Sequence, residues 1–99
     1  MAAALLLGVE KMSKEEQFEK CDEEWGKFER IENPRFKTPK LCGLVAIEEL
    51  EGKEIEFDAQ HDELCCGSCE RELTDEEVIH LLRCRILWNS EHECFYFFT

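Results

Sequence analysis

The feature that most constrains the fold is a run of five apolar residues, Cys94-Phe95-Tyr96-Phe97-Phe98. Aromatic residues favour extended structure, so the run predicts a strand. Side chains of a strand point alternately to two faces, and both faces of this strand are apolar. We therefore expect a central strand, covered on both sides. At a sheet edge, the same strand would instead pair with a partner or form a homodimer.

A helix that is apolar over much of its circumference is the second expected core element. Thr74 and Glu77 have the spacing of a capping box, which predicts a helix that begins after Thr74. Asn89 and Ser90 are expected to end it. Its apolar residues are Val78, Ile79, Leu81, Leu82, Ile86 and Leu87.

The N-terminal part of the chain predicts a long amphipathic helix. Ser13 and Glu16 form another capping-box pattern. Phe18, Cys21, Trp25 and Phe28 then recur at spacings of three, four and three, so one helix is expected over 14–31. A basic connector with two prolines follows over 30–40 and should lack regular structure.

Short strands are expected in the middle of the chain. The apolar run 44–47 and the alternating segment 55–58 predict a hairpin that turns around Glu51-Gly52. Residues 64–66 predict a third strand. Together these elements indicate an α+β fold: a long N-terminal helix, a small antiparallel sheet of three or four strands, a buried second helix and a C-terminal aromatic strand.

The length of 99 residues is sufficient for one domain with a modest core. Residues 13–99 are expected to form this domain, and residues 1–12, interrupted by Gly8, a weakly ordered extension. The apolar stretch 2–7 is too short for a membrane helix, and no positive charge precedes it as in a signal peptide. We therefore expect a cytoplasmic protein without membrane contact, whose seven cysteines are reduced thiols.

Four residues follow the pattern Cys-x2-Cys-x10-His-x3-Cys: Cys66, Cys69, His80 and Cys84. Structural zinc sites use four thiolate or imidazole ligands, and two cysteines separated by two residues converge from one turn. His80 and Cys84 would share one face of the second helix. Over about twenty residues the pattern resembles a zinc finger with CCHC ligands, and alternative ligands are Cys42, His61, Cys65, His92 and Cys94. The other open interpretation is that the cysteines are buried thiols that fill the core.

Enzymatic interpretations have less support. Cys66 and Cys69 have the spacing of a thiol-redox motif, but the predicted helix begins five residues after Cys69 and no βαβ pattern surrounds it. No catalytic group can be assembled from the pattern of residues. We therefore expect a protein that is not an enzyme, with a thiol-redox protein as the weakest alternative.

The negative charge is concentrated in one part of the chain. The net charge is −12, and residues 41–82 contain thirteen Asp or Glu but two Lys or Arg. Such a surface disfavours direct binding to nucleic-acid phosphates. It favours binding to a protein that has a basic surface, and nucleic-acid-binding proteins are one such class. The alternative is that the acids only keep the domain soluble.

In general character, a small acidic domain of this kind resembles phage-encoded inhibitors that mimic DNA and occupy a nucleic-acid channel. No motif assigns the chain to a named family. The sequence thus predicts a non-catalytic acidic interaction module, an inhibitor or regulator, and a small zinc-stabilised adaptor is the alternative. The residues expected to contact the partner are Glu48, Glu49, Glu51, Glu54, Glu56 and Asp58.

Overall fold

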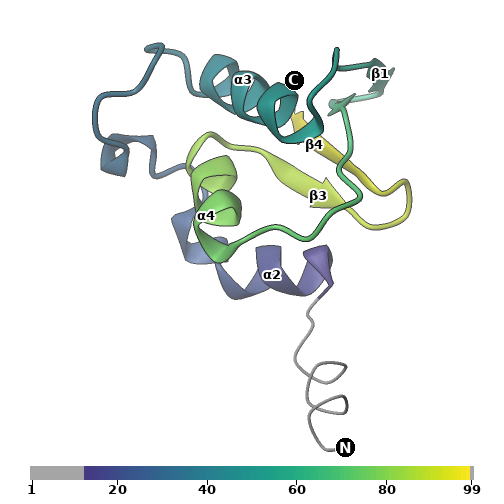
Figure 1. Ribbon diagram of the computed structural model, residues 1–99, viewed down its shortest axis with the longest axis horizontal. Coiled ribbons are helices and arrows are strands. Elements are labelled where there is room, and N and C mark those ends of the chain that lie inside the picture. Colours follow the sequence, from purple (N-terminus) through teal and green to yellow (C-terminus); the bar gives the residue numbers. More distant parts are fainter. Residues whose placement is uncertain (1–12, 99) are drawn as a thin grey trace, which may run out of the picture.

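The aromatic run forms strand β4 (Cys94–Phe98) of a four-stranded antiparallel sheet in the computed structural model, which describes residues 13–98 (Figure 1). The other strands are β1 (Phe57–Gln60), β2 (Glu63–Cys66) and β3 (Leu87–Asn89), and the strand order is β1-β2-β4-β3. β4 has a neighbour on each side, which confirms the prediction of a central strand. On the β3 side the pairing covers Cys94 to Tyr96, and a homodimer through this strand stays a prediction.

The two faces of β4 have different surroundings. Phe95 and Phe97 are buried, and the ring of Phe95 lies 5.1 Å from Trp88 and 6.4 Å from Phe18, measured between centroids. Tyr96 and Phe98 point to the opposite face, and Phe98 is half exposed. Only one face of this apolar strand is therefore fully covered by the rest of the described chain.

Three α-helices of the described chain complete a single α+β globule: α2 (Lys14–Lys20), α3 (Pro39–Glu51) and α4 (Asp75–Arg83). Side chains from all three share one core with the sheet. Burial of these apolar surfaces is the main stabilising contribution. The largest fully buried side chains are Phe95, Ile47, Leu81, Leu82, Ile86 and Val78.

Helix α4 begins as predicted but ends earlier. Thr74 and Glu77 form the complete capping box. At the other end, Arg85 has a left-handed backbone (φ 69°), and the N–H groups of Arg85 and Ile86 donate to the carbonyls of Leu82 and Leu81. These bonds are those of a Schellman motif, which closes the helix. The prediction that the helix continues to Asn89 is therefore wrong, and residues 87–89 form β3.

The predicted long N-terminal helix is also wrong, because α2 has only seven residues. Its capping box at Ser13 and Glu16 is present. Two 3₁₀ turns follow, η1 (Asp22–Glu24) and η2 (Phe28–Arg30). Between them, Gly26 has φ 76° and donates its N–H to the carbonyl of Leu82. This tertiary bond to α4 takes the backbone out of the helical path that the apolar spacing predicts.

The predicted strand at 44–47 lies inside helix α3, so this part of the hairpin prediction is wrong. Pro39 occupies the first turn of α3, and Gly52 ends the helix in the left-handed region (φ 73°). A Cβ at Gly43 would lie 2.6 Å from Cγ1 of Ile86. The close approach of α3 to the chain after α4 therefore requires glycine inside a helix, against its ordinary propensity.

The sheet contains a hairpin one step further along the chain. β1 pairs with β2 from Phe57 opposite Cys66 to Gln60 opposite Glu63, and His61 makes the turn with φ 49°. The expected third strand at 64–66 is confirmed as β2. The predicted extension at residues 1–12 lies outside the described residues. Within 13–98, every helix is too short or too polar to cross a membrane.

Candidate functional site

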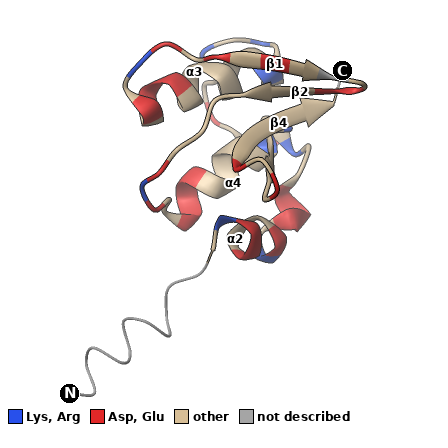
Figure 2. Cartoon of the chain, turned by 90° about the vertical axis from the view of Figure 1, so that its right-hand side faces the viewer, with Lys and Arg blue, Asp and Glu red and all other residues tan. Residues whose placement is uncertain are grey.

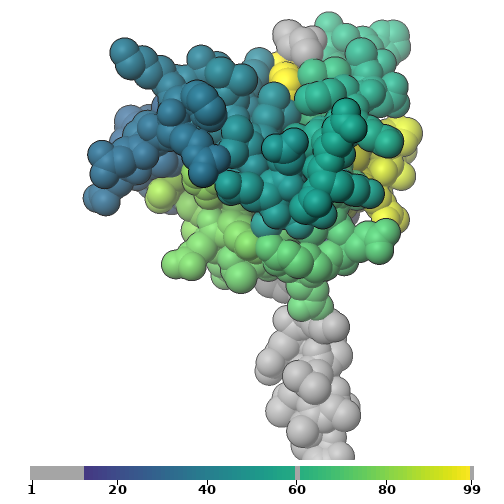
Figure 3. All heavy atoms as spheres, turned by 45° about the horizontal axis from the view of Figure 1, so that its top comes forward, coloured from purple at the N-terminus to yellow at the C-terminus, as the bar shows by residue number. Residues whose placement is uncertain are grey.

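An open groove of about 520 Å³ lies between the segment that joins α3 to β1 and the adjacent ends of β2 and β4. Three separate parts of the chain build it: the segment 51–58, the end of β2 with its following turn, and the turn before β4. Figure 3 shows the teal α3–β1 region beside yellow atoms of the C-terminal part. The lining residues are Glu51, Lys53, Glu54, Glu56, Phe57, Asp58, Cys65, Gly67, Ser68, His92, Glu93 and Cys94.

The groove gathers negative charge. Five of its lining residues are carboxylates, and Lys53 is the one Lys or Arg among the described residues that line it. We call the five the groove acids: Glu51, Glu54, Glu56, Asp58 and Glu93. Figure 2 shows red along the end of α3 and on β1. The groove can therefore attract cations, and it repels phosphate groups.

Glu51 differs from the other groove acids because it supports the fold. Its carboxylate is partly buried and accepts a hydrogen bond of 2.9 Å from the N–H of Ser68. The neighbouring Gly67 has φ 88°, and a Cβ there would collide with the carboxylate of Glu51. The last residue of α3 thereby fixes the turn that follows β2.

Four of the six acids predicted to bind a partner line the groove, and two do not. Glu51, Glu54, Glu56 and Asp58 line the groove. Glu48 and Glu49 are exposed on α3 outside it, and Glu49 makes an exposed ion pair of 3.3 Å with Arg35.

Glu93 also lines the groove, although no sequence pattern indicates it. This residue has φ 51° in the turn before β4, and its carbonyl accepts a hydrogen bond of 2.8 Å from the Ser68 hydroxyl. The turn is thereby attached to the segment after β2. No local pattern signals this position, because it depends on the pairing of β2 with β4.

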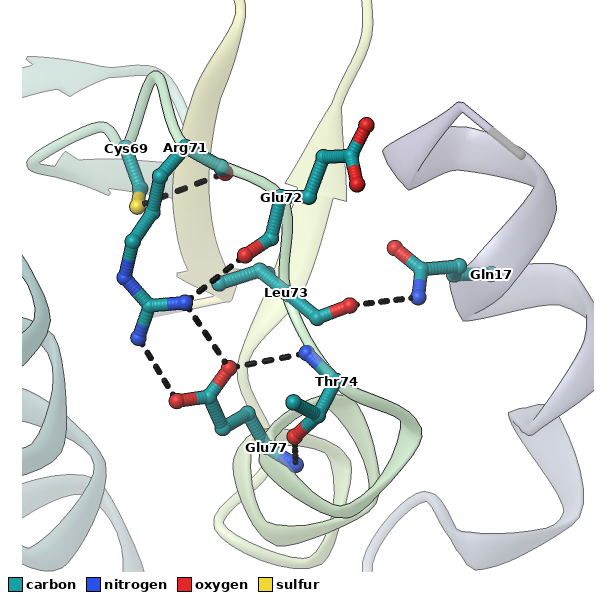
Figure 4. A network of polar contacts seen from close by, with 7 residues as sticks. All are labelled: Gln17, Cys69, Arg71, Glu72, Leu73, Thr74 and Glu77. Carbon is teal, nitrogen blue, oxygen red and sulfur yellow. Dashed lines mark hydrogen bonds and ion pairs between the residues drawn. The ribbon is translucent and has the colours of Figure 1, made fainter. Parts of the chain in front are cut away.

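The structure brings together one pair of the four predicted zinc ligands. Nε2 of His80 lies 3.8 Å from Sγ of Cys84, which is the C-cap residue of α4. Cys66 is fully buried in β2, and Sγ of Cys69 donates to the carbonyl of Arg71 over 3.7 Å (Figure 4). Within residues 13–98, no three Cys, His, Asp or Glu side chains lie close enough together to hold a metal ion.

Burial sets the protonation of these groups. It raises the pKa of the Cys66 thiol and of the Cys84 thiol to about 12 each. Burial also lowers the pKa of His80, with a further contribution from the charge of Arg83. At neutral pH this arrangement favours neutral thiols and a neutral imidazole. The CCHC zinc site stays a prediction, which metal analysis of protein purified without chelator would check.

The alternative zinc ligands are distributed over the molecule. Sγ of Cys94 lies 3.0 Å from Sγ of Cys65, and both residues line the groove together with His92. Sγ of Cys42 donates to the carbonyl of Phe36 over 3.2 Å. His61 is exposed in the turn between β1 and β2.

A second group of charged and polar residues, at the start of α4, forms a network of contacts within the molecule (Figure 4). Arg71 makes two hydrogen bonds with the carboxylate of Glu77, of 2.6 and 3.2 Å. Glu77 also accepts the N–H of Thr74, and the amide of Gln17 donates to the carbonyl of Leu73 over 2.8 Å. The network attaches the segment before α4 to α4 and α2, so we assign it a structural role.

Comparison of the chain with protein-family models, with curated proteins and with solved structures finds no match.

Proposed function

We propose that this protein is a non-catalytic acidic interaction module, an inhibitor or regulator that covers a basic surface of a partner protein. The observation that carries the proposal is the convergence of five carboxylates on a single groove, where Lys53 is the one Lys or Arg from residues 13–98. The sequence predicts an acidic surface over 41–82, and the groove identifies the part of that surface we consider most important.

The placement of the groove acids favours association with a cationic partner. Glu51 ends α3 and Asp58 lies in β1, while Glu54 and Glu56 lie in the segment that joins these elements and Glu93 lies in the turn before β4. Negative charges that a folded scaffold presents together accelerate encounter with a positively charged partner. Lysine and arginine side chains fit this groove, whereas nucleic-acid phosphates would be repelled.

An aromatic side chain at the groove adds an apolar contact. Phe57 is 54% exposed at the start of β1, an edge strand of the sheet. Aromatic residues surrounded by polar groups often make large contributions to protein interfaces. We infer that Phe57 contacts the partner while the carboxylates orient it.

Charge reversal in two places tests the proposal. The groove variant is Glu54→Lys, Glu56→Lys and Glu93→Lys, and the matched control is Glu19→Lys, Glu23→Lys and Glu29→Lys. All six residues are exposed, and both variants change the net charge equally. Each is used, beside the wild type, to capture partners from extracts of the native host, and captured proteins are eluted with increasing salt.

We expect the wild type and the control variant to capture the same basic protein. We also expect moderate salt to elute that protein from both. The groove variant should lose it, because the attraction becomes repulsion. Equal capture by the groove variant, or elution that does not depend on salt, would contradict the proposal. Equal loss in both variants would mean that net charge alone matters, and would contradict it as well.

A further inference from the structure

Two cysteines from different strands lie in direct contact at the wall of the groove. Sγ of Cys94 in β4 is 3.0 Å from Sγ of Cys65 in β2. Both side chains are almost buried, with exposed fractions of 9% and 7%, yet both line the open groove. A small solute in the groove can therefore reach the pair, while a large one is excluded by the surrounding side chains.

The register of the sheet explains the contact. β2 and β4 are antiparallel, with Cys65 opposite Tyr96. Cys94 is two residues from Tyr96, so it lies on the same face of the sheet and diagonally across from Cys65. Cys66 points to the other face, where it is fully buried in the core. The register thus brings Cys65, and not Cys66, into contact with Cys94.

We infer that Cys65 and Cys94 form a site of reversible oxidation, which a small uncharged peroxide converts into a disulfide between β2 and β4. The inference rests on the contact between the sulfurs and their place in the groove. It does not depend on the identity of a partner.

The geometry assigns a role to each sulfur. The Cys94 thiol donates its hydrogen to Sγ of Cys65, so Sγ of Cys65 is the accepting sulfur of the pair. We therefore assign the attack on peroxide to Cys65 and the second step to Cys94.

The chemistry requires one peroxide for each disulfide. Sγ of Cys65 attacks one peroxide oxygen, the O–O bond breaks, and the Cys65 thiol becomes a sulfenic acid while one water is released. Sγ of Cys94 then attacks the sulfenic sulfur, so that the S–S bond forms and the S–O bond breaks. The hydroxyl leaves as a second water with the proton of Cys94. The two sulfurs together lose two electrons, which reduce the peroxide, and a dithiol reductant returns them.

The groove acids impose a selectivity that can be measured. Hydrogen peroxide is uncharged, so the carboxylates around the pair do not repel it. Glutathione disulfide is larger and anionic, and it meets both steric exclusion and repulsion. We therefore expect peroxide to form the Cys65–Cys94 bond much faster than glutathione disulfide does.

The test uses the reduced full chain, treated with hydrogen peroxide, quenched with an alkylating reagent and analysed by mass spectrometry. The expected product has lost two hydrogen atoms, carries a Cys65–Cys94 cross-linked peptide and regains its original mass with dithiothreitol. Cys66→Ala removes the ambiguity of the adjacent residue, and Cys21→Ser is a control distant from the pair; both should keep the cross-link. Cys94→Ser should lose it and accumulate a sulfenic acid on Cys65, which dimedone traps.

Several results would overturn the inference. One is a cross-link between other cysteines, such as Cys66 and Cys69. Another is a wild-type chain whose number of free thiols is unchanged by peroxide. A third is a sulfenic acid on Cys65 that persists in the wild type. Peptide mapping of the wild type decides the matter even if Cys94→Ser fails to fold.

Discussion

Two groups of carboxylates in this molecule show how differently the same residue type can be used. Glu24, Asp75 and Glu77 are each paired with cations: Glu24 with Arg30 and Arg83, Asp75 with Lys20, and Glu77 with Arg71. Hydrogen bonds from Arg83, Lys20 and Arg71 are the main causes that lower the pKa values of these three groups. The groove acids instead share one groove, where Lys53 is the one Lys or Arg among the lining residues of the described chain.

The difference shows that a charge count does not locate a function. The paired acids hold helices and loops together, so their charge is used inside the fold. Charge of one sign is concentrated at the groove, which under the proposed function attracts a basic partner. Glu51 combines the two uses. It lines the groove, and its carboxylate also supports the fold by accepting the N–H of Ser68.

The largest expected effect separates Glu51 from the other groove acids. Gly67→Ala should lower the free energy of unfolding by about 2 kcal/mol, because the new Cβ meets both a positive φ and the carboxylate of Glu51. Urea unfolding measures this. In the double variant with Glu51→Ala, part of the loss should be recovered; strictly additive losses would show that Glu51 does not constrain this turn.

Removal of the α4 cap should have the next largest effect. Thr74→Ala removes the acceptor of the Glu77 N–H and should cost about 1 kcal/mol in thermal or urea unfolding. Glu77→Ala should also destabilise, since it removes the other half of the capping box. Glu77→Gln keeps that half and should destabilise less. Equal stability of the Ala and Gln variants would show that the capping contact contributes nothing.

Lowering the pH should reduce the free energy of unfolding through protonation of Glu77. The folded-state pKa of Glu77 is lowered, so its contribution is present above its ordinary value of 4.5 and is lost as the pH falls through the folded value. Unfolding experiments at decreasing pH should therefore show a shallower decline for Glu77→Gln than for the wild type. Arg71→Gln should flatten the curve in the same direction, and unchanged curves would contradict the assignment.

The smallest effect is expected in the groove. Glu54→Gln with Glu56→Gln should change the free energy of unfolding by less than about 0.5 kcal/mol, with a slight gain because like charges are removed. Added salt should reduce that gain, since it screens the repulsion in the wild type. A clear loss of stability in thermal unfolding would show that these two residues stabilise the fold, as Glu24, Asp75 and Glu77 do.

Local signals in the sequence predicted local structure well. Both capping boxes, at Ser13 and at Thr74, are present, and the aromatic run is the central strand. These features depend on contacts within three or four residues, or on the burial of a continuous apolar segment.

Features set by distant contacts could not be predicted. The apolar run 44–47 lies in a helix that packs against Ile86 at Gly43, and the segment after α2 is attached to α4 by the bond from Gly26 to Leu82. The groove has the same origin. Glu54 and Glu93 are far apart in sequence and meet only because the sheet order places β4 beside β2.

Hydrogen exchange of the chain with and without its captured partner shows whether the groove is the interaction surface. We expect slower exchange in the partner complex at 51–58 and at 92–94, the segments that carry the groove acids, with little change over α2 and η1. Protection confined to α2 and η1, with the groove exchanging as in the free protein, would contradict the claim that the groove is the interaction surface.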